Sequence, residues 1–268
     1  MALPALGQER PLKIDSPEIL GTGRVRVDSG IEFLRGQSYP LSGLHGDLFR
    51  LGVTSLRVGV GDFAEFQISG ALQDFFRTTY RAKPAIAPEF EGKNTRDFGD
   101  LVLATKLRLL SESRLRPAIA FKFEVQLPNA SDASGLGTNQ TEFYSRVLLG
   151  KQLGRARVLG ELGLAILGNP LVASTQADVA TYGAGVVMPL HEGLELVAGV
   201  NGRQGPHRVG NESRAQMQAG IRVRAAGLRW DVAAIAGLKP VDATYGLAVG
   251  LTYEFQAFRN KPQTASLR

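Results

Sequence analysis

The chain has 268 residues, with 31 Lys and Arg against 25 Asp and Glu, no cysteine, and a mean hydropathy of −0.04. The absence of cysteine excludes a disulfide framework, a thiolate metal site and a cysteine nucleophile. The net charge of +6 does not indicate nucleic-acid binding, because the basic residues form no run or helical stripe. The longest uncharged stretch, residues 162–177, is interrupted by Asn169-Pro170 and is too short to span a membrane as a helix.

Alternation of apolar and polar residues is the dominant pattern of the sequence. It is clearest from Arg116 to Leu127, where large apolar side chains at every second position are separated by small, polar or charged ones. Successive side chains of a strand point to opposite faces, so such a strand has one apolar face and one wet face. The pattern returns along nearly the whole chain without a helical pattern between. It predicts an all-β protein, an antiparallel transmembrane β-barrel with a polar lumen.

Turns rich in Gly, Asn, Asp, Pro and Ser divide the chain into about twelve predicted strands. In chain order these are residues 23–36, 47–60, 63–77, 97–110, 116–127, 142–151, 155–167, 178–190, 194–203, 213–225, 228–238 and 243–255. Short turns follow the even-numbered strands, and longer connections mostly follow the odd-numbered ones. Outer-membrane barrels have short periplasmic turns, longer extracellular loops and an even number of strands. The order of the links therefore supports the same fold.

The predicted barrel covers residues 21–258 and has a tail at each end. In the N-terminal tail, residues 1–20, the small residues Ala5 and Gly7 are spaced as at a signal-peptide cleavage site. This tail is interpreted either as the remnant of a secretion signal or as an ordinary disordered tail. Residues 259–268 form the C-terminal tail.

The last predicted strand ends in aromatic residues. Tyr253 and Phe255 suit the girdle of aromatic side chains at the membrane interface. A final strand with a terminal aromatic residue also resembles the signal read by the barrel-assembly machinery, which we expect as a partner. The chain departs from that pattern because it continues past Phe255 and Phe258.

Charged residues in the alternating strands are predicted to face the lumen. A Lys or Arg on the lipid-facing side at midplane would cost about 2–4 kcal/mol, so the inward register is preferred. These charges either select permeants at a constriction or pair with one another and brace the barrel. The candidates are Arg24, Arg26, Arg50, Glu65, Lys106, Arg108, Lys122, Glu124, Arg146, Glu161, Arg222, Arg224, Arg229, Asp231 and Glu254.

One block of the sequence resembles a known family. Residues 98–110 read FGDLVLATKLRLL and are followed by Arg116-Pro117-Ala118-Ile119-Ala120 and by Leu127-Pro128. This hairpin, together with residues 251–255, resembles the outer-membrane family named for the MetA-pathway of phenol degradation and related transporter-like barrels. The match covers about a sixth of the chain, and the rest agrees only in the spacing of strands and turns. The resemblance implies an outer-membrane barrel with a transport role and supplies no catalytic residue or substrate.

The candidates for enzymatic chemistry are few. His45, His191 and His207 fall in predicted loops or turns and lack the spacing of metal ligands. Some outer-membrane barrels are lipid hydrolases that use a Ser nucleophile and a His base. Here His207 and Ser213 share a loop region, without a clear orienting partner.

We expect a passive porin-like channel of the Gram-negative outer membrane, for small solutes that include aromatic or anionic ones. Besides the permeant and the barrel-assembly machinery, we expect the lipid bilayer of the outer membrane as a partner. We expect no catalytic residue, metal or cofactor, and no nucleic-acid partner. A lipid-modifying hydrolase, a structural or adhesive barrel without transport, and a soluble β-sandwich remain the alternatives.

Overall fold

The computed structural model describes residues 10–206 and 209–258. Nearly all of this part of the chain is strand or connecting turn, and it contains no helix long and apolar enough to cross a membrane. The strands are β1 Arg24–Tyr39, β2 Leu44–Val60, β3 Ala64–Arg81, β4 Asn94–Asp97, β5 Leu101–Leu110, β6 Ala118–Leu127, β7 Glu142–Leu153, β8 Ala156–Gly168, β9 Gln176–His191, β10 Leu194–Gln204, β11 Arg214–Ala225, β12 Leu228–Gly237 and β13 Tyr245–Gln256.

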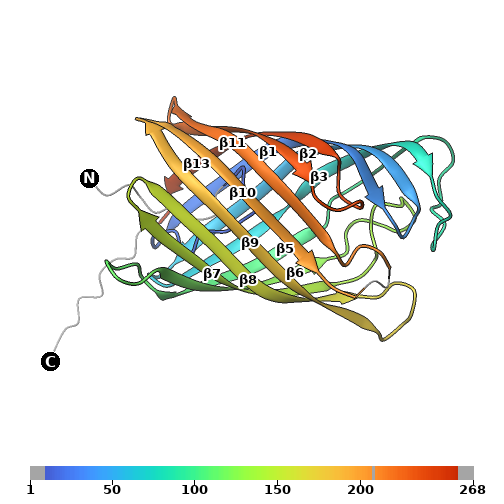
Figure 1. Cartoon of the computed structure of the whole chain (residues 1–268), viewed down its shortest axis with the longest axis horizontal. Helices are drawn as coiled ribbons and strands as arrows, with labels where there is room; N and C mark the ends of the chain where they lie inside the picture. The colour runs from blue at the N-terminus through green and yellow to red at the C-terminus, as the bar shows by residue number, and fades with distance from the viewer. Residues whose placement is uncertain (1–9, 207–208, 259–268) are drawn as a thin grey trace.

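The strands form one closed antiparallel barrel (Figure 1). Each strand pairs with its neighbour in sequence, and the first pairs with the last, from Arg24 opposite Gln256 to Arg35 opposite Tyr245. Strand β4 is the exception, because it pairs only with the outer part of β3, along the same edge that β5 pairs nearer the periplasmic turn. With β4 counted as the outer continuation of β5, the ring has twelve strands. The predicted fold class is confirmed.

The predicted strands agree with the observed ones except where side chains bend or extend the chain. The strand predicted at 97–110 is divided into β4 and β5, because the Asp97 carboxylate accepts a hydrogen bond from the Phe98 amide at 2.8 Å. The Gly99 amide then donates to the Ala71 carbonyl at 3.0 Å, which turns the chain back toward β3. The first hairpin is also longer than predicted, since pairing continues to Tyr39 opposite Leu44.

The short links lie together at one end of the barrel. Residues 61–63, 154–155, 192–193 and 226–227 connect strands there, and so does the longer link at 111–117. Strand β1 begins and β13 ends at this same end, because Arg24 pairs with Gln256. In outer-membrane barrels this is the periplasmic end. The opposite, outer end carries the longer loops at residues 82–93, 128–141 and 205–213.

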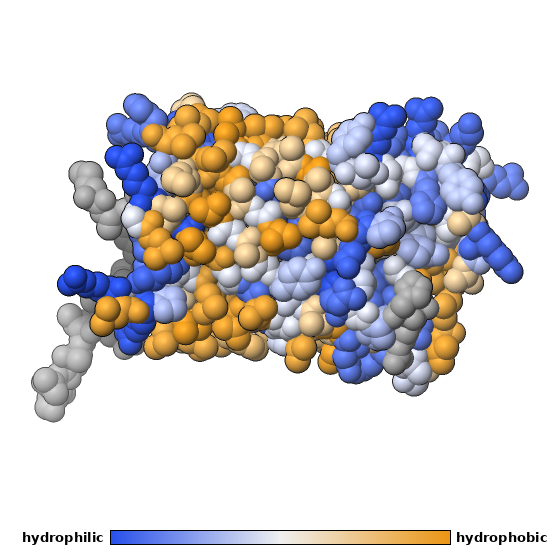
Figure 2. Space-filling view, viewed as in Figure 1, coloured by the Kyte–Doolittle hydropathy of each residue, from blue (hydrophilic) through white to orange (hydrophobic). Residues whose placement is uncertain are grey.

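An apolar belt surrounds the periplasmic and central part of the barrel, while the outer end is polar (Figure 2). The exposed side chains of this belt include Phe66, Leu72, Leu162, Leu164 and Leu247, each between 49% and 67% exposed. Exposed apolar area on this scale would be costly in water, and a membrane removes that cost. A closed barrel with such a belt satisfies every backbone group at membrane depth.

Candidate functional site

The charged candidates predicted from the sequence lie on strands of the wall, and most of them are buried. The buried ones are Arg26, Glu65, Lys106, Lys122, Glu124, Glu161, Arg222, Arg229 and Asp231. Arg24, Arg50, Arg108, Arg146 and Glu254 are partly exposed, and Arg224 is exposed. Because the wall is a single sheet, a wall side chain that is buried must point into the lumen. Their role in a permeation path stays a prediction.

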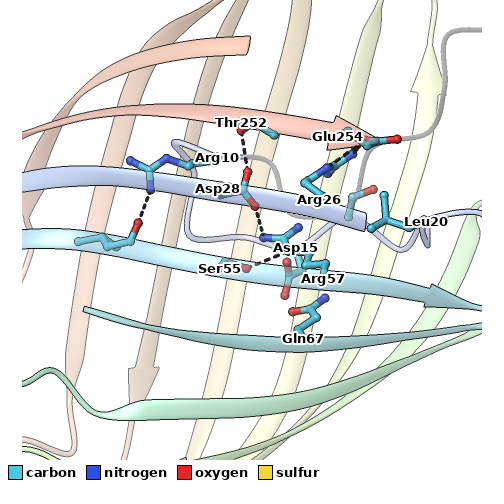
Figure 3. Close-up of polar contacts among 12 residues, drawn as sticks. Arg10, Asp15, Leu20, Arg26, Asp28, Ser55, Arg57, Gln67, Thr252 and Glu254 are labelled. Carbon is cyan, nitrogen blue, oxygen red and sulfur yellow. Dashed lines mark hydrogen bonds and ion pairs between the residues drawn. The ribbon is translucent and has the colours of Figure 1, made fainter. Parts of the chain in front are cut away.

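Most of these charges pair with opposite charges on neighbouring strands. Arg26 of β1 donates to Glu254 of β13 at 2.6 Å, and Arg57 of β2 lies 3.4 Å from Asp28 of β1 (Figure 3). Thr252 of β13 donates to the same Asp28 carboxylate at 2.6 Å. These ties join strands from both ends of the chain where the barrel closes. In this part of the wall the charges are thus paired across neighbouring strands.

A row of basic residues crosses the wall at the centre of the lumen. Lys106 of β5 lies directly opposite Lys122 of β6, which lies opposite Arg146 of β7. Like charges in adjacent cross-strand positions destabilise a sheet unless acids intervene. Glu65 pairs with Lys106 at 3.2 Å, and Glu124 contacts both Lys122 and Arg146. One more acid at this row comes from outside the wall.

That acid belongs to residues 10–20, which lie inside the barrel and which we name the luminal plug. Leu12 and Ile14 of the plug are 1% and 0% exposed and pack against Leu159, Val187 and Val197 of the wall. The sequence predicts a tail over residues 1–20, and the structure corrects this for residues 10–20. The reason is the burial of these apolar side chains and the charge pairs that follow. The cleavage-like residues Ala5 and Gly7, and the tail at 259–268, lie outside the described residues.

Four ion pairs tie the luminal plug to the wall. Its first two charges are basic and meet acids: Arg10 pairs with Asp231 at 3.2 Å and Lys13 with Glu32 at 3.4 Å. Its last two are acidic and meet bases: Asp15 pairs with Lys122 of the basic row, and Glu18 pairs with Arg157. The order of basic and acidic residues along the plug is therefore complementary to that of the wall residues they contact.

Backbone groups of the plug are also held by the wall. Lys106 donates to the Ser16 carbonyl at 3.2 Å, and the Leu20 amide donates to Glu65 at 2.7 Å. Burial raises the pKa of Asp15, but Lys122, Lys106 and Arg57 outweigh that effect, so its pKa lies well below the ordinary value. Asp15 is therefore a carboxylate that completes the basic row.

Glycines in the wall leave room for the plug. A Cβ atom added at Gly150 would stand 2.7 Å from Cγ of Pro17, and one added at Gly59 would stand 2.4 Å from the Leu20 carbonyl oxygen. Gly199 similarly faces the Ile14 side chain, with 2.8 Å from a built Cβ to Cδ1. Side chains at these inward positions would occupy the space of the plug. The wall is shaped to hold it.

A cavity of about 610 Å³ lies between the plug and the outer end of the barrel. Arg10 and Lys13 of the plug contribute to its floor. Leu34, Leu48 and Ile235 of β1, β2 and β12 form an apolar patch in its lining. Polar side chains surround this patch, since β1 and β2 also contribute Glu32 and Arg50, and the contributions of β7, β10 and β11 are mainly polar. The cavity therefore combines one apolar patch with a polar lining.

The charges around this outer cavity balance. Six basic residues line it, Arg10, Lys13, Arg50, Arg146, Arg203 and Arg214, and six acidic ones, Asp28, Glu32, Asp74, Asp100, Glu161 and Asp242. Many of them are paired, as Arg50 is with Asp74 at 3.1 Å. The basic excess of the whole chain is therefore not concentrated here.

A second cavity, of about 850 Å³, lies at the periplasmic end beside the turns after β7, β9 and β11. It is basic, since Arg155, Arg222, Arg224 and Arg229 line it together with Glu192 and Glu195. Arg222 pairs with Glu195 at 3.0 Å. The plug lies between the two cavities in the direction of the barrel axis, because its first residues meet the outer cavity and Glu18 reaches Arg157 near the periplasmic turn.

The structure brings together one Ser–His pair that the sequence pattern did not indicate. Ser38 Oγ lies 2.7 Å from Nδ1 of His45, across the first hairpin. Ser38 is 3% exposed and does not line the outer cavity. Ser213 instead bonds the Gly205 backbone, and His207 lies outside the described residues. Within the described residues, no group of three His, Cys, Asp or Glu is placed to hold a metal ion.

The comparisons with known proteins agree with the fold. No family model and no curated protein sequence matches the chain. Among solved structures, the COG4313 outer membrane channel from Pseudomonas putida F1 is similar, with a TM-score of 0.58 at 15% identity over 89% of this chain and 97% of that one. The translocator domain of the autotransporter NalP from Neisseria meningitidis has a TM-score of 0.49 at 14% identity, covering 88% and 90% of the two chains.

LpxR from Salmonella typhimurium has a TM-score of 0.48 at 9% identity, covering 86% of this chain and 99% of that one. Together with the apolar belt, the likeness to the Pseudomonas channel identifies the architecture. This chain has the fold of a bacterial outer-membrane β-barrel.

Proposed function

We propose that this barrel is a passive channel for small solutes whose lumen is closed at its centre by the luminal plug. The observation that carries the proposal is the outer cavity of about 610 Å³, which combines an apolar patch with polar groups and ends on the plug. A barrel that served only as a scaffold would gain nothing from a lined cavity of this size. Pockets that bind small molecules commonly combine apolar walls with a few placed polar groups.

The preferred permeant is a small solute with an apolar part, hydrogen-bonding groups and little net charge. Leu34, Leu48 and Ile235 offer the apolar contact. On the other side, the Tyr144 hydroxyl and Arg203 form a hydrogen-bonded pair at 2.7 Å. The balanced charges of the lining do not favour anions at this level. An anion preference would arise instead from the arginines of the periplasmic cavity.

The test uses purified protein in planar bilayers. We expect the wild type to give small, infrequent conductance steps, which come from the fraction of molecules whose plug is displaced. We expect nicotinamide in the outer compartment to block this current at lower concentration than nicotinate, its anionic analogue of nearly equal size. A Leu48→Ser substitution should weaken the nicotinamide block, since it removes part of the apolar patch. A complete absence of conductance, in wild type and in variants with a loosened plug, would contradict the channel.

A lipid hydrolase is the second candidate, and Ser38 with His45 is the observation that favours it. The 2.7 Å contact has the geometry of a nucleophile and its base. Its burial argues for a structural tie of the hairpin, because a phospholipid ester could not reach Oγ without movement of the residue 240 backbone above it. Phospholipid hydrolysis that disappears in Ser38→Ala would support the enzyme. The adhesive alternative predicts attachment that depends on the outer loops, without conductance.

A further inference from the structure

An aromatic row crosses the lipid-facing side of the barrel at the outer end of the apolar belt. Phe33 of β1, Phe49 of β2 and Phe75 of β3 lie directly opposite one another. The rings of Phe49 and Phe75 are 6.3 Å apart. Phe75 is the twelfth residue of β3, and a tilted strand of this length reaches the far boundary of the hydrocarbon layer. The row therefore marks the interface with the outer leaflet.

Arginines stand beside and just beyond this aromatic row. Arg35 is two residues beyond Phe33, and Arg77 is two residues beyond Phe75, toward the outer end. Arg96 of β4 lies opposite Phe75 in the same row. All three are exposed, and the residues flanking Arg77, Phe76 and Thr78, are buried, so Arg77 points outward.

The three arginines form one surface across β1 to β4, which we name the outer arginine patch. Strand spacing places Arg35 and Arg77 about 10 Å apart, with β2 between them. In β2 the residue opposite Arg77 is Asp47, a single acid that accepts a bond from the Gly36 amide. Arg35 donates to the Tyr245 hydroxyl at 3.1 Å, which holds its guanidinium at the interface. The patch has a net positive charge at the depth of lipid head groups.

Within the described residues, the patch is confined to one side of the barrel. On the other side, Asp178 of β9 is exposed and lies opposite Ile166 of β8. Its neighbours Ala177 and Val179 are buried, so Asp178 points outward. The asymmetry distinguishes the patch from a uniform belt of basic anchors.

We propose that the outer arginine patch binds the phosphate groups of the glycolipid of the outer leaflet, lipid A. Guanidinium groups bind phosphate through paired, charge-assisted hydrogen bonds. Basic side chains beside a membrane attract anionic head groups strongly, by several-fold in affinity for each residue. The aromatic row below the patch packs against the acyl chains of the same lipid. This interaction does not depend on the proposed channel function.

The test measures binding of lipid A to the purified full chain in detergent micelles. Three lipids are compared: phosphorylated lipid A, the same lipid after removal of its phosphates, and phosphatidylglycerol. The test variant is Arg35→Gln with Arg77→Gln and Arg96→Gln. Its matched control is Arg114→Gln with Arg116→Gln and Arg155→Gln, which removes the same charge from exposed positions at the periplasmic end.

We expect the test variant to bind phosphorylated lipid A at least about tenfold more weakly than wild type, while the control binds as wild type does. Dephosphorylated lipid A should bind wild type about as weakly as the phosphorylated lipid binds the test variant. Unchanged binding in the test variant overturns the proposal, and so does equal weakening by the control. Equal preference for phosphatidylglycerol also overturns it, since the patch would then be a general anion surface. A gel shift on boiling shows that each variant is folded.

Discussion

Replacing Asp15 with Asn should open the channel. Asp15 is 3% exposed and supplies the acid that the plug adds to the row of Lys106, Lys122 and Arg146. Removing one partner of a buried ion pair costs about 3–5 kcal/mol. Because Lys122 keeps Glu124 at 3.0 Å, we take the lower value of about 3 kcal/mol. This cost falls on the seated plug and should raise the displaced fraction about a hundredfold.

The assay is conductance in planar bilayers, together with swelling of proteoliposomes in a small neutral sugar. Lys13→Gln is the matched control, because Lys13 lies in the same plug but its side chain is 30% exposed. Its partner Glu32 also keeps Arg50, at 3.5 Å. Such partly exposed pairs contribute less than about 1 kcal/mol. If the Asp15→Asn variant folds normally but gives the same conductance and the same proteoliposome swelling as wild type, the charge of Asp15 does not hold the plug in its closed position.

Mild acid should not reproduce the effect of the Asp15→Asn substitution. The pKa of Asp15 is held below its ordinary value of 3.8, so its ionic contact is complete at any pH above that value. The contact is lost only as the pH falls through the lowered folded value. Conductance of the wild type at pH 5 should therefore equal that at pH 7. An increase at pH 5 would mean that another group releases the plug.

Three further predictions follow from the residues that line the lumen. Gly150→Ala should raise conductance without a change of charge, because the added Cβ meets the plug proline at 2.7 Å. Gly160→Ala should leave conductance unchanged, since the nearest contact of its added Cβ is 3.8 Å away. Equal currents in the two variants would contradict the idea that wall glycines make space for the plug. Lys106→Met removes the cation that pairs with the buried Glu65 carboxylate and should lower the free energy of unfolding by about 3–5 kcal/mol, visible as a lower temperature for the gel shift on boiling. Arg222→Gln with Arg224→Gln should reduce anion relative to cation permeability, measured as a reversal potential in a salt gradient; an unchanged potential would remove both residues from the permeation path.

The barrel could be predicted because the two faces of a membrane strand meet lipid and lumen, and each environment restricts which residues can occupy its face. At Phe121, Phe123 and Val125 the lipid requires apolar side chains, while Lys122 and Glu124 between them face the lumen. Loop lengths add an independent signal, since short turns and long loops lie at opposite ends. The division into β4 and β5 could not be predicted, because it depends on contacts with distant residues: the Gly99 amide donates to the Ala71 carbonyl of β3, and the Ser131 amide donates to the Asp97 carboxylate at 2.7 Å.

The plug could not be predicted, because residues 10–20 have neither period two nor a helical period. Their positions are set by partners far along the chain, such as Asp231 for Arg10 and Arg157 for Glu18. One weak signal was nevertheless present. Inward glycines such as Gly150 leave space that something must fill.

The distribution of contacts along the plug argues that the channel opens by partial displacement. A complete exit of the plug would break several buried pairs, each costing about 3–5 kcal/mol, and the sum would rival the stability of the barrel. The contacts are uneven, since residues 10–13 border the outer cavity whereas Asp15, Ser16 and Leu20 are nearly inaccessible. Residues 10–13 can therefore move into the outer cavity while the remainder stays seated, at the cost of withdrawing Leu12 from its apolar contacts with the wall. Asp15 lies at the boundary between these two parts, and for this reason its charge decides how far the displacement extends.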